Sequence, residues 1–151
     1  MTHDANISNF VYVTFIRTTP DRLWSALTEP DFIKQYWFNM NVETTWKIGA
    51  PWELRFEDGR IADAGEIVEF EPTKRLVIKW RNEWKPEFKE MGYTQCTMEL
   101  KPQKDGVVKL SITHTADRMA AQFIEAVSGG WPRILSNLKS LLETGEVILK
   151  A

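Results

Sequence analysis

The chain has 151 residues, of which 43% are hydrophobic and 26% are charged, and its formal net charge is −2. A chain of this length is typical of a single domain, which we expect to span residues 1–151 with a core over roughly residues 10–145. The weak negative charge argues against nucleic acid as a partner, and no apolar run is long enough to predict a membrane span. Cys96 is the only cysteine, which excludes an internal disulfide and favours the cytoplasm.

The first forty residues predict one strand followed by two short helices. Residues 10–16 are β-branched and aromatic, which is typical of a strand. Thr19 suits the N-cap position, and Pro20 suits the first position of a helix over residues 20–27. The Glu29-Pro30 pair ends this helix, and a second helical turn is expected over residues 31–36.

The middle of the chain predicts an antiparallel meander. Asp58-Gly59 is a typical hairpin turn, and the other connections between strands are also short. Six strands are expected, over residues 41–46, 52–56, 65–70, 75–80, 94–100 and 107–115.

A polar segment over residues 81–92 interrupts this pattern. It carries Trp84, Phe88 and Met91 among charged residues. Aromatic tips on a polar segment favour a lid over an opening, or else a structured loop whose aromatic side chains pack on the body of the domain.

The C-terminal segment, residues 120–145, is the only long stretch with a helical apolar period. Its apolar residues recur at i, i+3, i+4 and i+7, and they are Trp131, Ile134, Leu135, Leu138, Leu141 and Leu142. Gly129, Gly130 and Pro132 weaken this helix, so we expect a kink there or two helices that meet there. The apolar face either packs as simple core or covers a cavity.

The resulting order, β-α-α-β6-α, predicts an α+β domain in which a curved antiparallel sheet packs against a long helix. Residues 15–30 read FIRTTPDRLWSALTEP, which resembles the opening of the START-like (SRPBCC) superfamily. Within it, the chain is most similar to the branch related to the activator of the 90-kDa heat-shock protein ATPase. Four further stretches match in order: WKIG at 46–49, GEIVE at 65–69, RLVIKW at 75–80 and GGWP at 129–132.

This resemblance implies a helix-grip fold of the birch-pollen-allergen type, with a cavity between the sheet and the C-terminal helix. Most of the residues expected to line this cavity lie on the apolar face of a predicted strand or of the C-terminal helix. The expected lining residues are Trp37, Trp52, Leu54, Phe56, Trp80, Met98, His114, Phe123, Val127 and Trp131. Trp84, Phe88 and Met91 would form the lid.

His114 is the one polar residue among these candidates. It continues the alternating run of Val108, Leu110 and Ile112, so it should point toward the cavity. It would serve as a polar anchor or proton donor for a ligand, or else be an imidazole that a neighbour satisfies. The sequence contains no metal, haem or phosphate-binding motif, so neither a cofactor nor a metal is expected.

Three functions remain open. The first is non-enzymatic binding of a small hydrophobic or amphipathic molecule, and it needs only the cavity. The second is a partner-binding domain that stimulates a chaperone ATPase in a stress response, as the resemblance implies. The third is a cyclase or hydrolase of aromatic substrates, against which the lack of clustered acid–base groups argues. In each case we expect a monomer or a homodimer.

Overall fold

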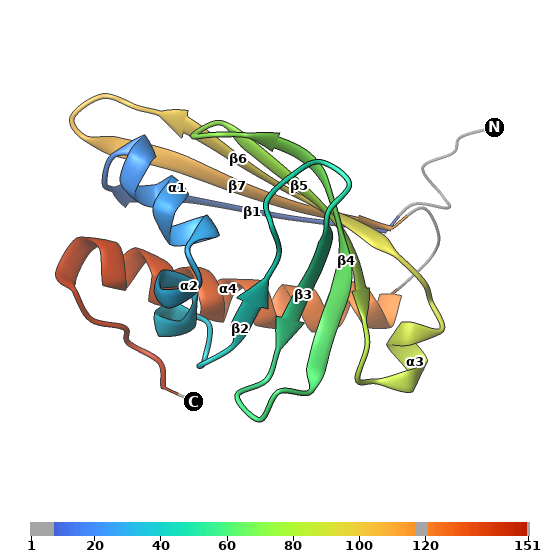
Figure 1. Cartoon of the computed structure of the whole chain (residues 1–151). Coiled ribbons are helices and arrows are strands. Elements are labelled where there is room, and N and C mark those ends of the chain that lie inside the picture. The colour runs from blue at the N-terminus through green and yellow to red at the C-terminus, as the bar shows by residue number, and fades with distance from the viewer. Residues whose placement is uncertain (1–7, 117–120, 151) are drawn as a thin grey trace.

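The computed structural model describes residues 8–116 and 121–150. Within these residues, seven strands form one antiparallel sheet in the order β1-β7-β6-β5-β4-β3-β2. The elements are β1 (Ser8–Arg17), α1 (Pro20–Thr28), α2 (Pro30–Tyr36), β2 (Asn41–Glu43), β3 (Pro51–Arg55), β4 (Ile61–Glu71), β5 (Arg75–Asn82), α3 (Pro86–Lys89), β6 (Thr94–Pro102), β7 (Val107–Ala116) and α4 (Ala121–Thr144). The sheet curves over α4, with α1 and α2 at one end and α3 at the other (Figure 1). The predicted α+β helix-grip architecture is confirmed.

Helix α4 is a single uninterrupted helix that contains Pro132. The alternative of two helices meeting at this point is therefore wrong. A helical glycine costs about 1 kcal/mol and a proline about 3 kcal/mol relative to alanine. Burial of Trp131, Leu135 and Leu138 against the sheet offsets this cost, because each large apolar side chain contributes about 2 kcal/mol.

Local signals set most element boundaries. The Thr19 hydroxyl accepts a hydrogen bond from the Arg22 backbone N–H at 3.1 Å, so the predicted N-cap of α1 is confirmed. The strand predicted over residues 41–46 ends at Glu43, and Trp46 has a φ of 58°, which a strand does not allow. Strands β4 and β5 are longer than predicted: β4 begins at Ile61, and β5 continues to Asn82.

Gly65 allows two tryptophans to meet across the sheet. It pairs with Trp52 on β3 and with Trp80 on β5. A Cβ atom at this position would lie 1.6 Å from the backbone oxygen of Lys79, so only glycine fits. Because Gly65 has no side chain between Trp52 and Trp80, the centroids of the two indole rings lie only 4.4 Å apart. This contact holds Trp80 at the position from which it lines the site described below.

Candidate functional site

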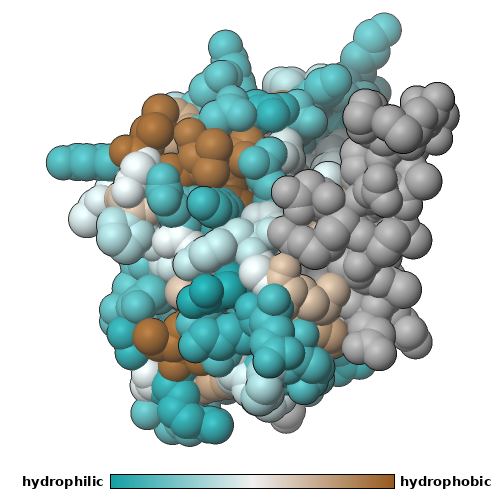
Figure 2. All heavy atoms as spheres, turned by 90° about the vertical axis from the view of Figure 1, so that its right-hand side faces the viewer, coloured by the Kyte–Doolittle hydropathy of each residue, from teal (hydrophilic) through white to brown (hydrophobic). Residues whose placement is uncertain are grey.

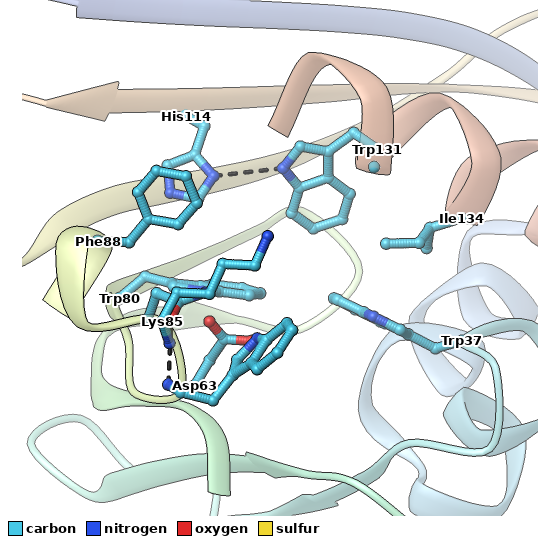
Figure 3. Close-up of a pocket in the computed structure, with 11 residues that line it drawn as sticks. Trp37, Asp63, Trp80, Lys85, Phe88, His114, Trp131 and Ile134 are labelled. Atoms are coloured by element: carbon cyan, nitrogen blue, oxygen red, sulfur yellow. Dashed lines mark hydrogen bonds between the residues drawn. The ribbon is translucent and has the colours of Figure 1, made fainter. Parts of the chain in front are cut away.

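The described residues enclose a pocket of about 250 Å³ toward the α3 end of the domain. Strands β4, β5 and β7, helix α4 and the segment around α3 contribute to its walls (Figure 3). Its lining residues are Trp37, Asp63, Trp80, Asn82, Trp84, Lys85, Phe88, His114, Gly130, Trp131 and Ile134. The outer surface at this end is mostly hydrophilic, with hydrophobic atoms in a few separate groups (Figure 2). No broad apolar patch is visible among the described residues on that face.

Three indole rings from distant parts of the chain form the apolar wall. Trp37 follows α2, Trp80 lies on β5 and Trp131 lies on α4. The Trp37 and Trp131 rings meet edge to face at 5.4 Å, and the Trp80 and Trp131 rings meet at 5.9 Å. The Trp37 and Trp80 rings stack at 6.0 Å. These separations are within the favourable range for aromatic pairs, so the three rings hold one another in place.

His114 is buried in a chain of hydrogen bonds that joins four elements. The Trp131 indole N–H donates to His114 Nδ1 at 3.2 Å (Figure 3). Because an indole N–H can only donate, Nδ1 carries no proton, and Nε2–H donates to the Thr94 hydroxyl at 2.8 Å. Thr94 donates in turn to the backbone oxygen of Trp80 at 3.1 Å.

This network keeps the imidazole neutral. Burial lowers the pKa of His114 to about 3, so the ring is uncharged at physiological pH. His114 lies on the same buried face as Leu110 and Ile112, as its alternation predicted. Both ring nitrogens are already engaged by Trp131 and Thr94. Neighbouring side chains therefore satisfy both ring nitrogens of His114, as the second of the two interpretations of this residue expects.

Asp63 brings a carboxyl group to the opposite wall. Its carboxylate points into the pocket (Figure 3), where the side chain of Trp80 donates a hydrogen bond to it. Burial raises the pKa of Asp63 to about 7, and the nearby charge of Glu83 acts in the same direction. The carboxyl group therefore changes its charge close to neutral pH, unlike an exposed aspartate.

The turn after β5 positions a lysine at the pocket. The Asn82 side-chain oxygen accepts hydrogen bonds from the backbone N–H groups of Trp84 and Lys85, at 3.2 and 2.9 Å. The Lys85 ammonium then lies 5.1 Å from the centroid of the Trp84 ring and 5.5 Å from that of Phe88. Both distances are within the range of cation–π contacts.

The predicted cavity residues line two spaces in the structure, and Trp37 and Trp80 contribute to both. Trp37, Trp80, His114 and Trp131 line the pocket, as do Trp84 and Phe88 of the predicted lid, whereas Met91 does not line it. The remaining inward residues surround a void of only about 10 Å³ next to α1 and α2, and they are Trp52, Leu54 and Met98. A void of that size holds at most one water molecule, so these three residues form packed core.

Phe56 lies outside the pocket, where its ring contacts Trp84 edge to face at 5.4 Å. The side chains of Phe123 and Val127 lie outside the described residues. The segment over residues 81–92 contains the short helix α3, and its role as a lid remains a prediction.

Sequence reasoning missed Asp63, Asn82, Lys85, Gly130 and Ile134. A signal for Asp63 was present. Asp63 lies two residues before Gly65 and four residues before Ile67, so the three residues share one face of a strand. A strand predicted to begin at residue 61 would therefore have placed Asp63 on the inner face with them. The position of Lys85 depends on the turn that Asn82 caps, and strand periodicity does not describe that turn.

Two further observations concern the described residues as a whole. They contain no group of His, Cys, Asp and Glu side chains that could hold a metal ion. Over residues 8–116 and 121–150, no helix has both the length and the apolar character needed to cross a membrane.

Solved structures share this architecture at low sequence identity. Protein MLL2253 from Mesorhizobium loti is 22% identical, with a TM-score of 0.77 over 93% of this chain and 100% of that one. The Aha1 dimer from Colwellia psychrerythraea is 20% identical, with a TM-score of 0.74 over 91% of this chain and 98% of that one. PFC0360w, an HSP90 activator from Plasmodium falciparum, is 22% identical, with a TM-score of 0.73 over 89% and 95%. These similarities show the fold alone.

No curated protein matches the chain in sequence. A family model does match, over residues 17–143, which is most of the domain. That range begins at the end of β1 and reaches the last turn of α4, so it contains every described residue that lines the pocket. The chain belongs to the family described as activator of Hsp90 ATPase homolog 1-like proteins.

Proposed function

We propose that this domain binds a small amphipathic molecule in the pocket formed by Trp37, Trp80 and Trp131, without transforming it. The observation that carries the proposal is the pocket of about 250 Å³ with three mutually packed indole rings on its wall. Apolar walls with a few polar groups are the usual composition of small-molecule sites. We further propose that residues 1–151 act as a single domain in the cytoplasm.

The volume limits the size of the ligand. At about 30 Å³ per water-sized group, the pocket holds on the order of ten non-hydrogen atoms. Burial of about 200 Å² of apolar ligand surface would contribute about 5 kcal/mol before the cost of association. Affinity in about the millimolar range is therefore expected, and a flat apolar body with one polar end is the expected shape.

Two neighbouring glycines of α4 provide the test. Gly130 lines the pocket, whereas Gly129 is exposed, and a Cβ atom at either position meets nothing within 4 Å. Gly130→Leu should fill the pocket, and Gly129→Leu is the matched control with the same helix-stabilising change. A panel of aromatic and aliphatic amphiphiles should raise the melting temperature of the wild type and of Gly129→Leu, but not of Gly130→Leu. Equal shifts in all three proteins would place binding elsewhere.

A second candidate is a partner-binding domain that stimulates a chaperone ATPase. It is supported by the family membership and by the likeness to an HSP90 activator and to an Aha1 dimer. The decisive measurement is the ATPase rate of a purified 90-kDa heat-shock protein with and without this protein. An increased rate that survives Gly130→Leu would assign this role to the surface, and sedimentation of the same samples would distinguish monomer from homodimer.

A third candidate is chemistry on an aromatic substrate, such as that of a cyclase or hydrolase. It is supported by two titratable groups with displaced pKa values in one pocket, Asp63 and His114. A carboxyl group with a pKa of about 7 suits general acid–base catalysis, whereas both ring nitrogens of His114 are engaged in the fold. Mass spectrometry of a bound ligand after incubation would reveal turnover, and turnover that ends in Asp63→Asn would favour the enzyme.

A further inference from the structure

Asp63 is the charged group that the sheet itself holds at the pocket, and it is negative once its carboxyl group is ionised. Asp63 lies within β4, between Leu54 on β3 and Asn82 on β5, so two neighbouring strands hold its backbone. Its side chain is further held by the hydrogen bond from Trp80. A carboxylate in such a position is poorly solvated, and it gains more from a cation in the pocket than an exposed carboxylate would.

The other charged groups nearby do not reverse this sign. His114 is neutral, because its ring is buried and its Nδ1 accepts from an indole N–H. Glu83 adds negative potential at Asp63, while its own carboxylate pairs with Arg81 and Lys89. The only cation among the described lining residues is Lys85.

The contacts of Lys85 show that an ammonium group can lie against the aromatic side chains of the pocket. Its ammonium group lies over the rings of Trp84 and Phe88, and its side chain extends across the pocket (Figure 3). The side chains of Trp80 and Trp131 line the same space. Tryptophan faces attract ammonium groups most strongly among the aromatic side chains. Lys85 therefore occupies a site suited to an ammonium group, at the end of a flexible chain of four methylene groups.

We propose that the pocket selects ligands that carry a protonated amine, with Asp63 as the counter-ion and the indole faces as the cage. This inference rests on the proposed binding function. The amine would displace the Lys85 ammonium, which is only partly buried and can turn toward solvent. Asp63 cannot move in the same way, because it belongs to an interior strand of the sheet. The ligand class is a primary or methylated amine on a flat apolar body.

Three probes with the same body but different charge test the inference. They are 4-phenylbutylamine, 4-phenylbutanol and 4-phenylbutyrate, each of which fits the volume of the pocket. Calorimetric titration at about pH 8 keeps the amine protonated and Asp63 ionised. We expect the amine to bind at least about tenfold more tightly than the alcohol or the acid, as expected for a desolvated charge pair.

Three substitutions identify the residues responsible. Asp63→Asn preserves the shape of the side chain and should bring the affinity for the amine to within about twofold of that for the alcohol. Glu66→Gln removes a charge from an exposed position on the same strand and should leave the preference for the amine unchanged. Lys85→Gln removes the internal ammonium and should strengthen binding of the amine.

The alternative outcomes are distinct. Tightest binding of the acid, lost in Lys85→Gln, would overturn the inference and make the pocket an anion site. Equal binding of all three probes, or an amine preference that survives Asp63→Asn, would overturn it while leaving the proposed binding function in place. If none of the probes binds, and no amphiphile of the earlier panel shifts the melting temperature, the proposed function fails, and this inference fails with it.

Discussion

Acidification should affect the stability of this protein through two pocket residues that act in opposite directions. The pKa of His114 is about 3 in the folded protein and about 6.5 when unfolded. Between these values only the unfolded chain binds the proton, so stability is present above about pH 6.5 and is lost as the pH falls. Asp63 has a folded pKa of about 7 and an unfolded value of about 3.9, so the folded state binds the proton first. Its contribution therefore increases as the pH falls from about 7 to 4.

The magnitudes follow from the limiting slope of about 1.4 kcal/mol per pH unit for each group. Between about pH 7.5 and 5.0, His114 should reduce the free energy of unfolding by about 2 kcal/mol. Over the same interval Asp63 should increase it by about 1 to 2 kcal/mol, since its side chain is only partly buried. The two effects nearly cancel in the wild type, so the balance is visible only when one group is removed.

Urea unfolding followed by tryptophan fluorescence at several pH values would measure this balance. Asp63→Asn should lose about 2 kcal/mol on acidification, because only the His114 effect remains, which is about 1 to 2 kcal/mol more than Glu66→Gln should lose. His114→Gln keeps an acceptor and a donor for Trp131 and Thr94, and it should instead become more stable over the same pH interval. If Asp63→Asn follows the wild type to within about 0.5 kcal/mol, the assigned pKa of Asp63 is wrong.

Three further substitutions test the framework around the pocket. Gly65→Ala should prevent folding, because its Cβ would lie 1.6 Å from the Lys79 oxygen; a native circular dichroism spectrum and melting curve would contradict the tight approach of β4 and β5. Asn137 is buried and bonds the backbone of the C-terminal tail at 2.7 and 2.8 Å, so Asn137→Leu should cost about 2 to 4 kcal/mol in urea unfolding. That cost should shrink when the tail after Glu146 is deleted, and an unchanged cost would show that the tail is not what Asn137 holds. Thr94→Val should leave the His114 N–H without its acceptor and cost about 1 to 3 kcal/mol, whereas a neutral result would remove Thr94 from the network.

Much of the fold could be predicted because its determinants are local. Alternation along β7 places His114 on the inner face with Leu110 and Ile112 wherever that strand lies. The Thr19 cap and the helical period of α4 depend only on residues within a few positions of one another. The order of the elements and their short connections then leave few topologies other than an antiparallel meander covered by the last helix.

The location of the pocket depends on contacts between distant segments. Trp52 and Trp80 both face inward, but α1 and α2 close the space around Trp52, while the α3 end beside Trp80 remains open. Asp63 acquires its raised pKa only because pairing with Leu54 on β3 and Asn82 on β5 holds its carboxyl group where it is buried. Periodicity specifies which face a side chain occupies, and packing between elements decides whether that face meets another side chain or a cavity. For this reason the sequence alone determined the architecture and the inward faces, and only the tertiary structure decided which inward residues form the site.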